Sequence, residues 1–431
     1  MFNTTDYSTG MKTIYSEKQV HDYIYRIGLE SLITSDFPYS ATQGAMTAAQ
    51  VDAPFELWQI MRARALDRLA RMHNLMRQAT LSGSQVNLPT GKTRMQLDLL
   101  GYHDEGLFVL ELKVNKTAER NAFSELFAYS NYVAEIFAPS GRRDITNVLV
   151  ANIDNEITRH AFLYDLLIAD REVIVYRPVW DGTLDTLRFE PYIPNDQDFR
   201  RFTNQLLSHD AMSCVVASFD DLPGWYDSQE DEGSLNDRTI EYLSLVSTYA
   251  AQLMEAEGLH GFCFMRKPYA EVGSYYDRPN SLIICAINPF GSGDIGDASS
   301  ILAQIPTKHR AAFIETPHWG FNGRLIRIAQ RAVAETLQYG VQSYGHTALW
   351  SWMITSMIET VHNHKFAFRP TGMLREAYGS YLGSQYAARM AGHSIEDRSL
   401  LQGEELYNWF QAWDFMERCG FKEIERDYSP F

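Results

Sequence analysis

The sequence predicts an α/β fold for its N-terminal half, a mixed sheet flanked by helices. Two apolar runs, 95–102 and 107–113, are joined by the turn-forming letters HDEG, which predicts a β-hairpin. Two further apolar runs, 145–153 and 172–179, have the composition of buried strands. Segments with helical periodicity lie before the hairpin and between the later runs. The order of these elements therefore indicates strands and helices that share one core.

Helices are expected where apolar residues recur three or four positions apart. In AERNAFSELFAYSNYVAEIF this spacing aligns Phe123, Leu126 and Val133 on one face. In FELWQIMRARALDRLARMHNLMRQ it aligns Met61 and Leu69. The predicted helices of this half are 15–34, 54–79, 118–137 and 156–171.

The composition changes after the last predicted strand of this half. The stretch FDDLPGWYDSQEDEGSLND is acidic and contains Pro, Gly and Ser, which predicts a loop or a domain boundary. A helix at 238–257 and two strands, GFCFMR and SLIICAI, come next, and the remaining pattern is mostly helical and rich in tryptophan. We therefore expect an N-terminal helical extension at 1–53, a mixed-sheet domain at 54–200, an acidic linker region at 201–237, and a mostly helical α+β domain at 238–431.

Composition excludes several classes of protein. With 45% apolar and 21% charged residues in 431, the chain is typical of globular proteins. The four cysteines form no CxxC pair, so neither a zinc site nor a disulfide framework is indicated. No apolar stretch is long enough to span a membrane and no signal peptide is evident, so we expect a cytoplasmic protein without a membrane partner. The net charge of -16 argues against a surface that binds nucleic acid everywhere, although 54–120 carries more Lys and Arg than Asp and Glu.

Charged side chains end the predicted hairpin strands. Because strand side chains alternate, Glu111 and Lys113 share a face and Leu112 points to the other. If the first strand brings Asp98 alongside, two carboxylates meet, and each raises the pKa of the other unless a cation is present. Mg²⁺ or Mn²⁺, held by one or two carboxylates and water, would remove this conflict. The alternative is an exposed strand that alternates charged and apolar residues, because Glu-x-Lys alone has little specificity.

These residues also resemble a known family. The pattern RMQLDLL…FVLELK, followed by a helix with SELFAYSNYV, resembles the PD-(D/E)XK nuclease superfamily. The longer sequence pattern that continues through VLVAN is similar to the catalytic domain of NucS-type endonucleases. The likeness covers about residues 54–180. It implies a restriction-endonuclease-like domain at 54–200 that hydrolyses DNA, with Asp98, Glu111 and the backbone carbonyl of Leu112 holding the metal. Lys113 is then expected to assist attack by water.

The chain departs from the family pattern at two positions. Leu97 replaces the proline that usually precedes the aspartate, and Glu125 replaces the usual glutamine four residues before Tyr129. A carboxylate cannot donate to a phosphate, so Glu125 is either a further metal ligand or exposed to solvent. Tyr129 either contacts the DNA backbone or packs. Glu56 is the candidate for an acid that many members carry on their first helix, or an ordinary first-turn acid favoured by the helix dipole.

The resemblance also suggests partners. Basic residues near the expected metal site, Arg94, Lys116 and Arg120, are candidate phosphate contacts. With Glu125 and Tyr129 they form the set of residues expected to border the nucleic acid. DNA is the expected partner, with RNA left open, and the family implies a homodimer. The domain at 238–431 is expected to sense a protein or small-molecule trigger, as in an anti-phage defence effector. The alternative is a non-catalytic module that binds nucleic acid or protein and retains the nuclease scaffold.

Overall fold

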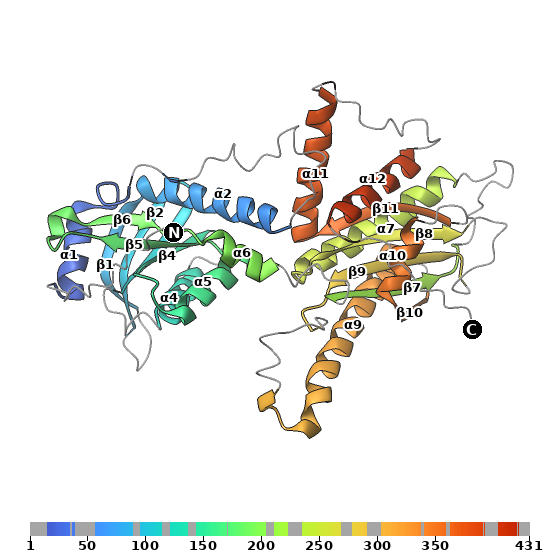
Figure 1. The fold of residues 1–431 in the computed structure, drawn as a ribbon, viewed down its shortest axis with the longest axis horizontal. Coiled ribbons are helices and arrows are strands. Elements are labelled where there is room, and N and C mark those ends of the chain that lie inside the picture. The colour runs from blue at the N-terminus through green and yellow to red at the C-terminus, as the bar shows by residue number, and fades with distance from the viewer. Residues whose placement is uncertain are drawn as a thin grey trace, which may run out of the picture. The chain divides into compact units, whose positions relative to one another are not determined.

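The computed structural model describes most of the chain as two compact units, each with its own sheet (Figure 1). The first unit holds the elements from α1 to β6 and the second those from β7 to α12. The molecule is therefore a mixed α/β protein. The described residues are 15–34, 37–38, 57–88, 95–113, 121–136, 144–169, 171–203, 211–222, 235–268, 278–290, 303–337, 340–358, 363–390, 392, 404–419 and 421.

The sheet of the first unit has six strands in chain order. The first three form an antiparallel meander, the third to fifth are parallel, and the sixth returns antiparallel. Each parallel step needs a crossover, which α4 (Ala122–Ile136) and α5 (Glu156–Leu167) supply. The strands are β1 (Thr80–Leu88), β2 (Met95–His103), β3 (Gly106–Leu112), β4 (Ile145–Val150), β5 (Val173–Val179) and β6 (Arg188–Pro191), with a 3₁₀ turn, η3 (Leu184–Thr186), before β6.

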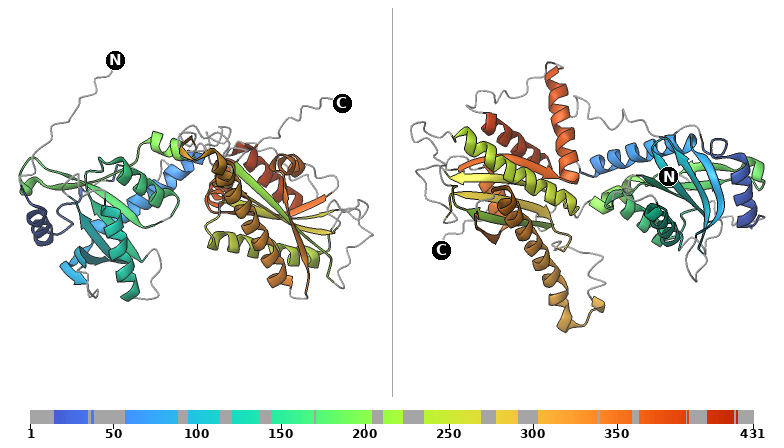
Figure 2. Two further views of the ribbon diagram at one scale, coloured as in Figure 1. Left: turned by 90° about the horizontal axis from the view of Figure 1, so that it is seen from below. Right: turned by 180° about the vertical axis from the view of Figure 1, so that it is seen from behind.

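Helices cover both faces of this sheet. The helix α2 (Leu57–Arg77) runs across one face, and α4 and α5 lie on the other (Figures 1 and 2). The helix α1 (Glu17–Ile27) begins at a capping box in which Ser16 and Gln19 exchange hydrogen bonds. The segment after α1 forms a bridge between Ile33 and Phe189 of β6. The N-terminal helix, expected to be a separate extension, therefore belongs to the first unit.

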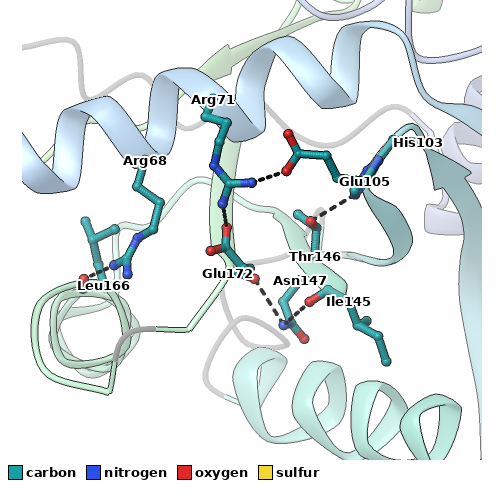
Figure 3. Close-up of polar contacts among 9 residues, drawn as sticks. All are labelled: Arg68, Arg71, His103, Glu105, Ile145, Thr146, Asn147, Leu166 and Glu172. Carbon is teal, nitrogen blue, oxygen red and sulfur yellow. Dashed lines mark hydrogen bonds and ion pairs between the residues drawn. The ribbon is translucent and has the colours of Figure 1, made fainter. Parts of the chain in front are cut away.

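Arginine side chains attach α2 to the sheet (Figure 3). Arg71 forms ion pairs with Glu105 in the β2–β3 turn and, at 2.5 Å, with Glu172 just before β5. Arg68 donates to the carbonyl of Leu166 at the end of α5. Asn147 of β4 donates to the carbonyl oxygen of Glu172 at 3.1 Å. These contacts show that the basic face of α2 contributes to the structure of the first unit.

The second unit has a five-stranded sheet in which every pair is antiparallel, with the order β10-β7-β9-β8-β11. Its strands are β7 (Met212–Phe219), β8 (Gly261–Pro268), β9 (Asn280–Ile287), β10 (Ser343–Ala348) and β11 (Asn363–Thr371). Its helices are α7 (Asp237–Ala256), α9 (Thr307–Leu337), α10 (Trp350–Ile358), α11 (Met373–Met390) and α12 (Glu404–Arg418), and α6 (Asp196–Thr203) precedes β7.

Alternation along β8 divides the core of the second unit into two layers. Cys263 and Met265 pack with apolar residues of α7 and α9 on one face. Phe262 and Phe264 face the other side, where Phe262 meets Trp350 at 6.3 Å between ring centroids. Phe264 meets Trp409 at 4.8 Å. The tryptophan-rich sequence of this half is thus explained by an aromatic layer.

Several elements differ from the sequence prediction. The hairpin and the helices of the first unit are found, but β1, β6, β10 and β11 were not predicted. β1 (TLSGSQVNL) is polar and carries Gly83, so its sequence has the composition of a loop. The predicted linker 201–237 contains β7, a fully buried strand. The second unit therefore combines helices with a five-stranded antiparallel sheet, which is larger than the two strands predicted. No helix among the described residues is long and apolar enough to cross a membrane.

Candidate active site

Asp98 and Glu111 come together through the register of the β2–β3 hairpin. Leu99 pairs with Leu110 and Leu100 with Val109. Continuing this register by one step places Asp98 opposite Glu111, on the same face of the sheet. The amide of Leu112 donates to Asp98 Oδ2 at 2.9 Å, which fixes the aspartate against the end of β3. The carboxylates are thus paired as the sequence predicted.

Lys113 lies between two carboxylates at the same place. Its Nζ is 2.5 Å from Oε1 of Glu111 and 2.7 Å from Oε2 of Glu125 on α4. Its backbone amide donates to the carbonyl of Val150 at 2.9 Å, so the pairing of β3 with β4 continues past Leu112. The lysine is therefore held by backbone and side chain together. Glu125 pairs with Lys113 while its side chain remains 41% exposed, and its roles as a further metal ligand or a nucleic-acid contact stay predictions.

The electrostatics of this group are unusual. Burial, followed by the charge of Asp98, raises the pKa of Glu111 to about 8, although Lys113 opposes the shift. Burial also raises the pKa of Asp98, against the hydrogen bond from Leu112 and the charge of Lys113. Glu111 is only 2% exposed, and its Oε2 is buried without a hydrogen-bond partner among the residues that the structure describes. Such an orphaned acceptor is costly unless a ligand binds to it.

Lys113 is a fixed cation. Burial alone lowers its pKa, but the charges of Glu111 and Glu125 and their hydrogen bonds outweigh burial and raise the pKa above its ordinary value. The side chain is then an ammonium group at neutral pH. It can orient water or stabilise developing negative charge, but it cannot accept a proton from water. The role expected of Lys113 at this site is therefore an electrostatic one.

The helix α1 adds two residues that the sequence analysis missed. Glu17 lies within electrostatic range of the site: burial raises its pKa, Lys113 lowers it, and Asp98 raises it again. His21, one turn later, is 2% exposed, and its Nε2 lies 2.7 Å from the backbone carbonyl oxygen of Asp98. Their spacing of four residues is visible in the sequence, but nothing in it indicates that this helix approaches β2.

The remaining predicted residues divide into two groups. Tyr129 is half-buried on α4, and its pKa is raised first by burial and then by Glu111 and Glu125, so it borders the site. The role of the Leu112 carbonyl as a metal ligand stays a prediction. Four predicted residues lie outside the described part of the chain: Glu56, Arg94, Lys116 and Arg120.

The donor set can be tested against a metal ion. Within the described residues, no three histidine, cysteine, aspartate or glutamate side chains form a group that could hold one. Mg²⁺ nevertheless needs only one or two carboxylates, because it keeps several water ligands. Asp98 and Glu111 supply two carboxylates, and the unpartnered Oε2 of Glu111 is the oxygen to which a metal would bind. The residues therefore fit a hydrated divalent ion rather than an all-protein cage.

Comparisons with known proteins supply no assignment. The chain matches no family model, no curated protein and no solved structure. A function for this site must therefore be argued from its own geometry.

Proposed function

We propose that the first unit is a metal-dependent nuclease of the PD-(D/E)XK type that hydrolyses DNA phosphodiester bonds. The order of its elements supports this: an antiparallel meander, a crossover helix and a parallel fourth strand. The observation that carries the proposal is the pair of facing carboxylates, Asp98 and Glu111, with one orphaned oxygen beside Lys113. A divalent cation and a phosphate are the ligands that such a group suits best.

Each residue has a defined task in this proposal. Asp98 and Glu111 hold the ion, which when bound lowers the pKa of its water and neutralises phosphate charge. Lys113 places a permanent positive charge beside the attacking water or the phosphate. Glu125 keeps the ammonium group in place, and Glu17 adds a further carboxylate near the site.

A second function has one observation in its favour. Lys113 forms ion pairs with two carboxylates, Glu111 and Glu125, so one positive charge offsets part of their negative charge without a metal. A scaffold that binds nucleic acid or protein without cleavage would also tolerate this arrangement. The unpartnered Oε2 of Glu111 argues against it, because a purely structural ion pair gains nothing from a buried orphan acceptor.

The two functions are separated by cleavage and metal binding. Supercoiled plasmid, single-stranded DNA and RNA are incubated with Mg²⁺ or Mn²⁺ and the wild type, Glu111→Ala or Lys113→Ala, and Mn²⁺ binding is measured by calorimetry. The nuclease predicts cleavage by the wild type alone and Mn²⁺ binding that requires Glu111. A wild type that neither cleaves nor binds Mn²⁺ would leave the scaffold function.

The proposal for the second unit is that it senses a trigger or a partner for the nuclease, as in a cytoplasmic anti-phage defence effector. Its support is architectural: the unit has its own sheet and core, independent of the candidate site. Cells that carry the wild type or Glu111→Ala are infected with phage, and DNA cleavage in them is measured. Protection by the wild type that is absent with Glu111→Ala would support this role.

A further inference from the structure

The β1–β2 ladder is interrupted beside the candidate site. Its register pairs Ser84 with Leu99 and Val86 with Leu97, and passes over Gln85 and Asp98 between them. Gln85 has a φ of 47°, in the left-handed region that a non-glycine residue seldom adopts. Gln85 and Asp98 are thus left out of a register that is otherwise continuous on both sides of them.

His21 occupies this gap. Its Nε2 lies 2.7 Å from the carbonyl oxygen of Asp98, and a carbonyl only accepts, so Nε2 carries the proton and donates. The ring is buried, and its neighbours Val20 and Ile24 are both 0% exposed, which anchors this face of α1. The hydrogen bond thus joins helix α1 to the backbone of Asp98, the proposed metal ligand.

Two hydrogen bonds then hold Asp98, one at its side chain and one at its main chain. Leu112 of β3 binds the carboxylate at Oδ2, and His21 of α1 binds the main chain. We propose that His21 is a positioning residue that sets the place of Asp98 for metal binding. This proposal rests on the proposed nuclease function. Groups that orient a metal ligand in this way typically affect metal affinity or activity about 10- to 100-fold when removed.

Three variants test the role. His21→Leu removes the donor while keeping an apolar, helix-compatible side chain, and His21→Gln restores an N–H at a similar reach. His103→Leu is the matched control: His103 is also buried and lies on β2, but it bonds Thr146 Oγ1 at the turn end of the hairpin. Each variant is compared with the wild type in Mn²⁺ calorimetry, in plasmid cleavage resolved into kcat and KM, and in thermal unfolding without metal.

The expected result is selective. His21→Leu weakens Mn²⁺ binding about tenfold or more and lowers kcat with little change in KM for DNA, whereas His21→Gln recovers most of both. His103→Leu lowers thermal stability but leaves Mn²⁺ affinity at the wild-type value.

Two outcomes would overturn the role of His21. One is Mn²⁺ binding and kcat of His21→Leu equal to the wild type; the other is an equal loss of Mn²⁺ affinity in His21→Gln and His103→Leu, which would indicate general destabilisation. A wild type that neither binds Mn²⁺ nor cleaves would instead contradict the nuclease itself, so the two failures are distinguishable.

Discussion

Two buried glutamates of the first unit, Glu111 and Glu172, each lie beside a cation, yet their surroundings differ. Glu172 pairs with Arg71 of α2 at 2.5 Å, and its own backbone carbonyl binds Asn147 (Figure 3). Glu111 pairs with Lys113 at the same distance, 2.5 Å, but faces Asp98 and keeps one buried oxygen without a partner. The first is a complete structural pair, and the second leaves a position for a ligand.

The difference shows how to separate a structural charge from a functional one. Burying a carboxylate is unfavourable in both places, and a cation offsets the penalty in both. At Glu111, burial and then the charge of a second carboxylate, Asp98, raise the pKa to about 8. A fold gains no stability from this arrangement, so it is the better candidate for chemistry.

The largest expected effect comes from the same substitution at the two sites. Glu111→Gln should lower cleavage about 10²- to 10³-fold, since a neutral amide cannot hold the metal charge. Glu172→Gln should leave cleavage close to the wild type and lower stability instead. Plasmid cleavage and denaturant unfolding of both variants measure this. A comparable loss of cleavage in both variants would show that Glu111 and Glu172 do not differ as a functional and a structural residue.

The next effect is on the pH dependence of stability without metal. An unfolded glutamate ionises near its ordinary pKa of 4.5, whereas folded Glu111 retains its proton up to about 8. In that interval unfolding releases a proton, so the free energy of unfolding falls as pH rises, by at most about 1.4 kcal/mol per pH unit. The contribution is fully present below the unfolded value and is lost as pH rises through about 8.

Denaturant unfolding at several pH values, for the wild type beside Glu111→Gln, isolates this contribution. The difference between the two proteins should change in favour of the variant as pH rises, because glutamine does not ionise. Parallel pH profiles would remove the basis for a raised pKa at Glu111.

A smaller effect is expected from Arg71→Ala. The substitution leaves the carboxylate of Glu172, 2% exposed, without its cation, but Arg71 itself is 39% exposed and solvent screens part of the interaction. We expect a loss of about 1.5–3 kcal/mol in the free energy of unfolding, with Mn²⁺ affinity unchanged. Chemical denaturation and calorimetry provide the two readings, and a weakened Mn²⁺ affinity would link the structural pair to the site.

The smallest effect is expected from Glu125→Gln. The side chain is 41% exposed, so its pair with Lys113 is worth about 1 kcal/mol or less, and cleavage should fall up to about fivefold. The loss should appear in kcat, because Glu125 contacts Lys113 rather than DNA. A changed KM for DNA with kcat intact would instead support contact with nucleic acid.

The candidate site was predictable where its residues are close in sequence. Asp98, Glu111 and Lys113 lie in one hairpin, and its alternating side chains and its turn residues can be recognised in the sequence. Glu17 and His21 were not predictable as site residues, because His21 and Asp98 are separated by 77 positions. The strand β1 was missed for a related reason: its polar sequence forms a strand only because β2 pairs with it.

The sequence by itself determined the local periods: the hairpin, the amphipathic helices, and the shared face of Glu111 and Lys113. These follow from repeats of 2 and about 3.6 residues that any segment carries alone. Only the tertiary structure decided that α1 reaches Asp98, that Glu125 pairs with Lys113, and that one oxygen of Glu111 is buried without a partner. These properties depend on which surfaces pack together and on the burial that results, and burial is a property of the folded chain as a whole.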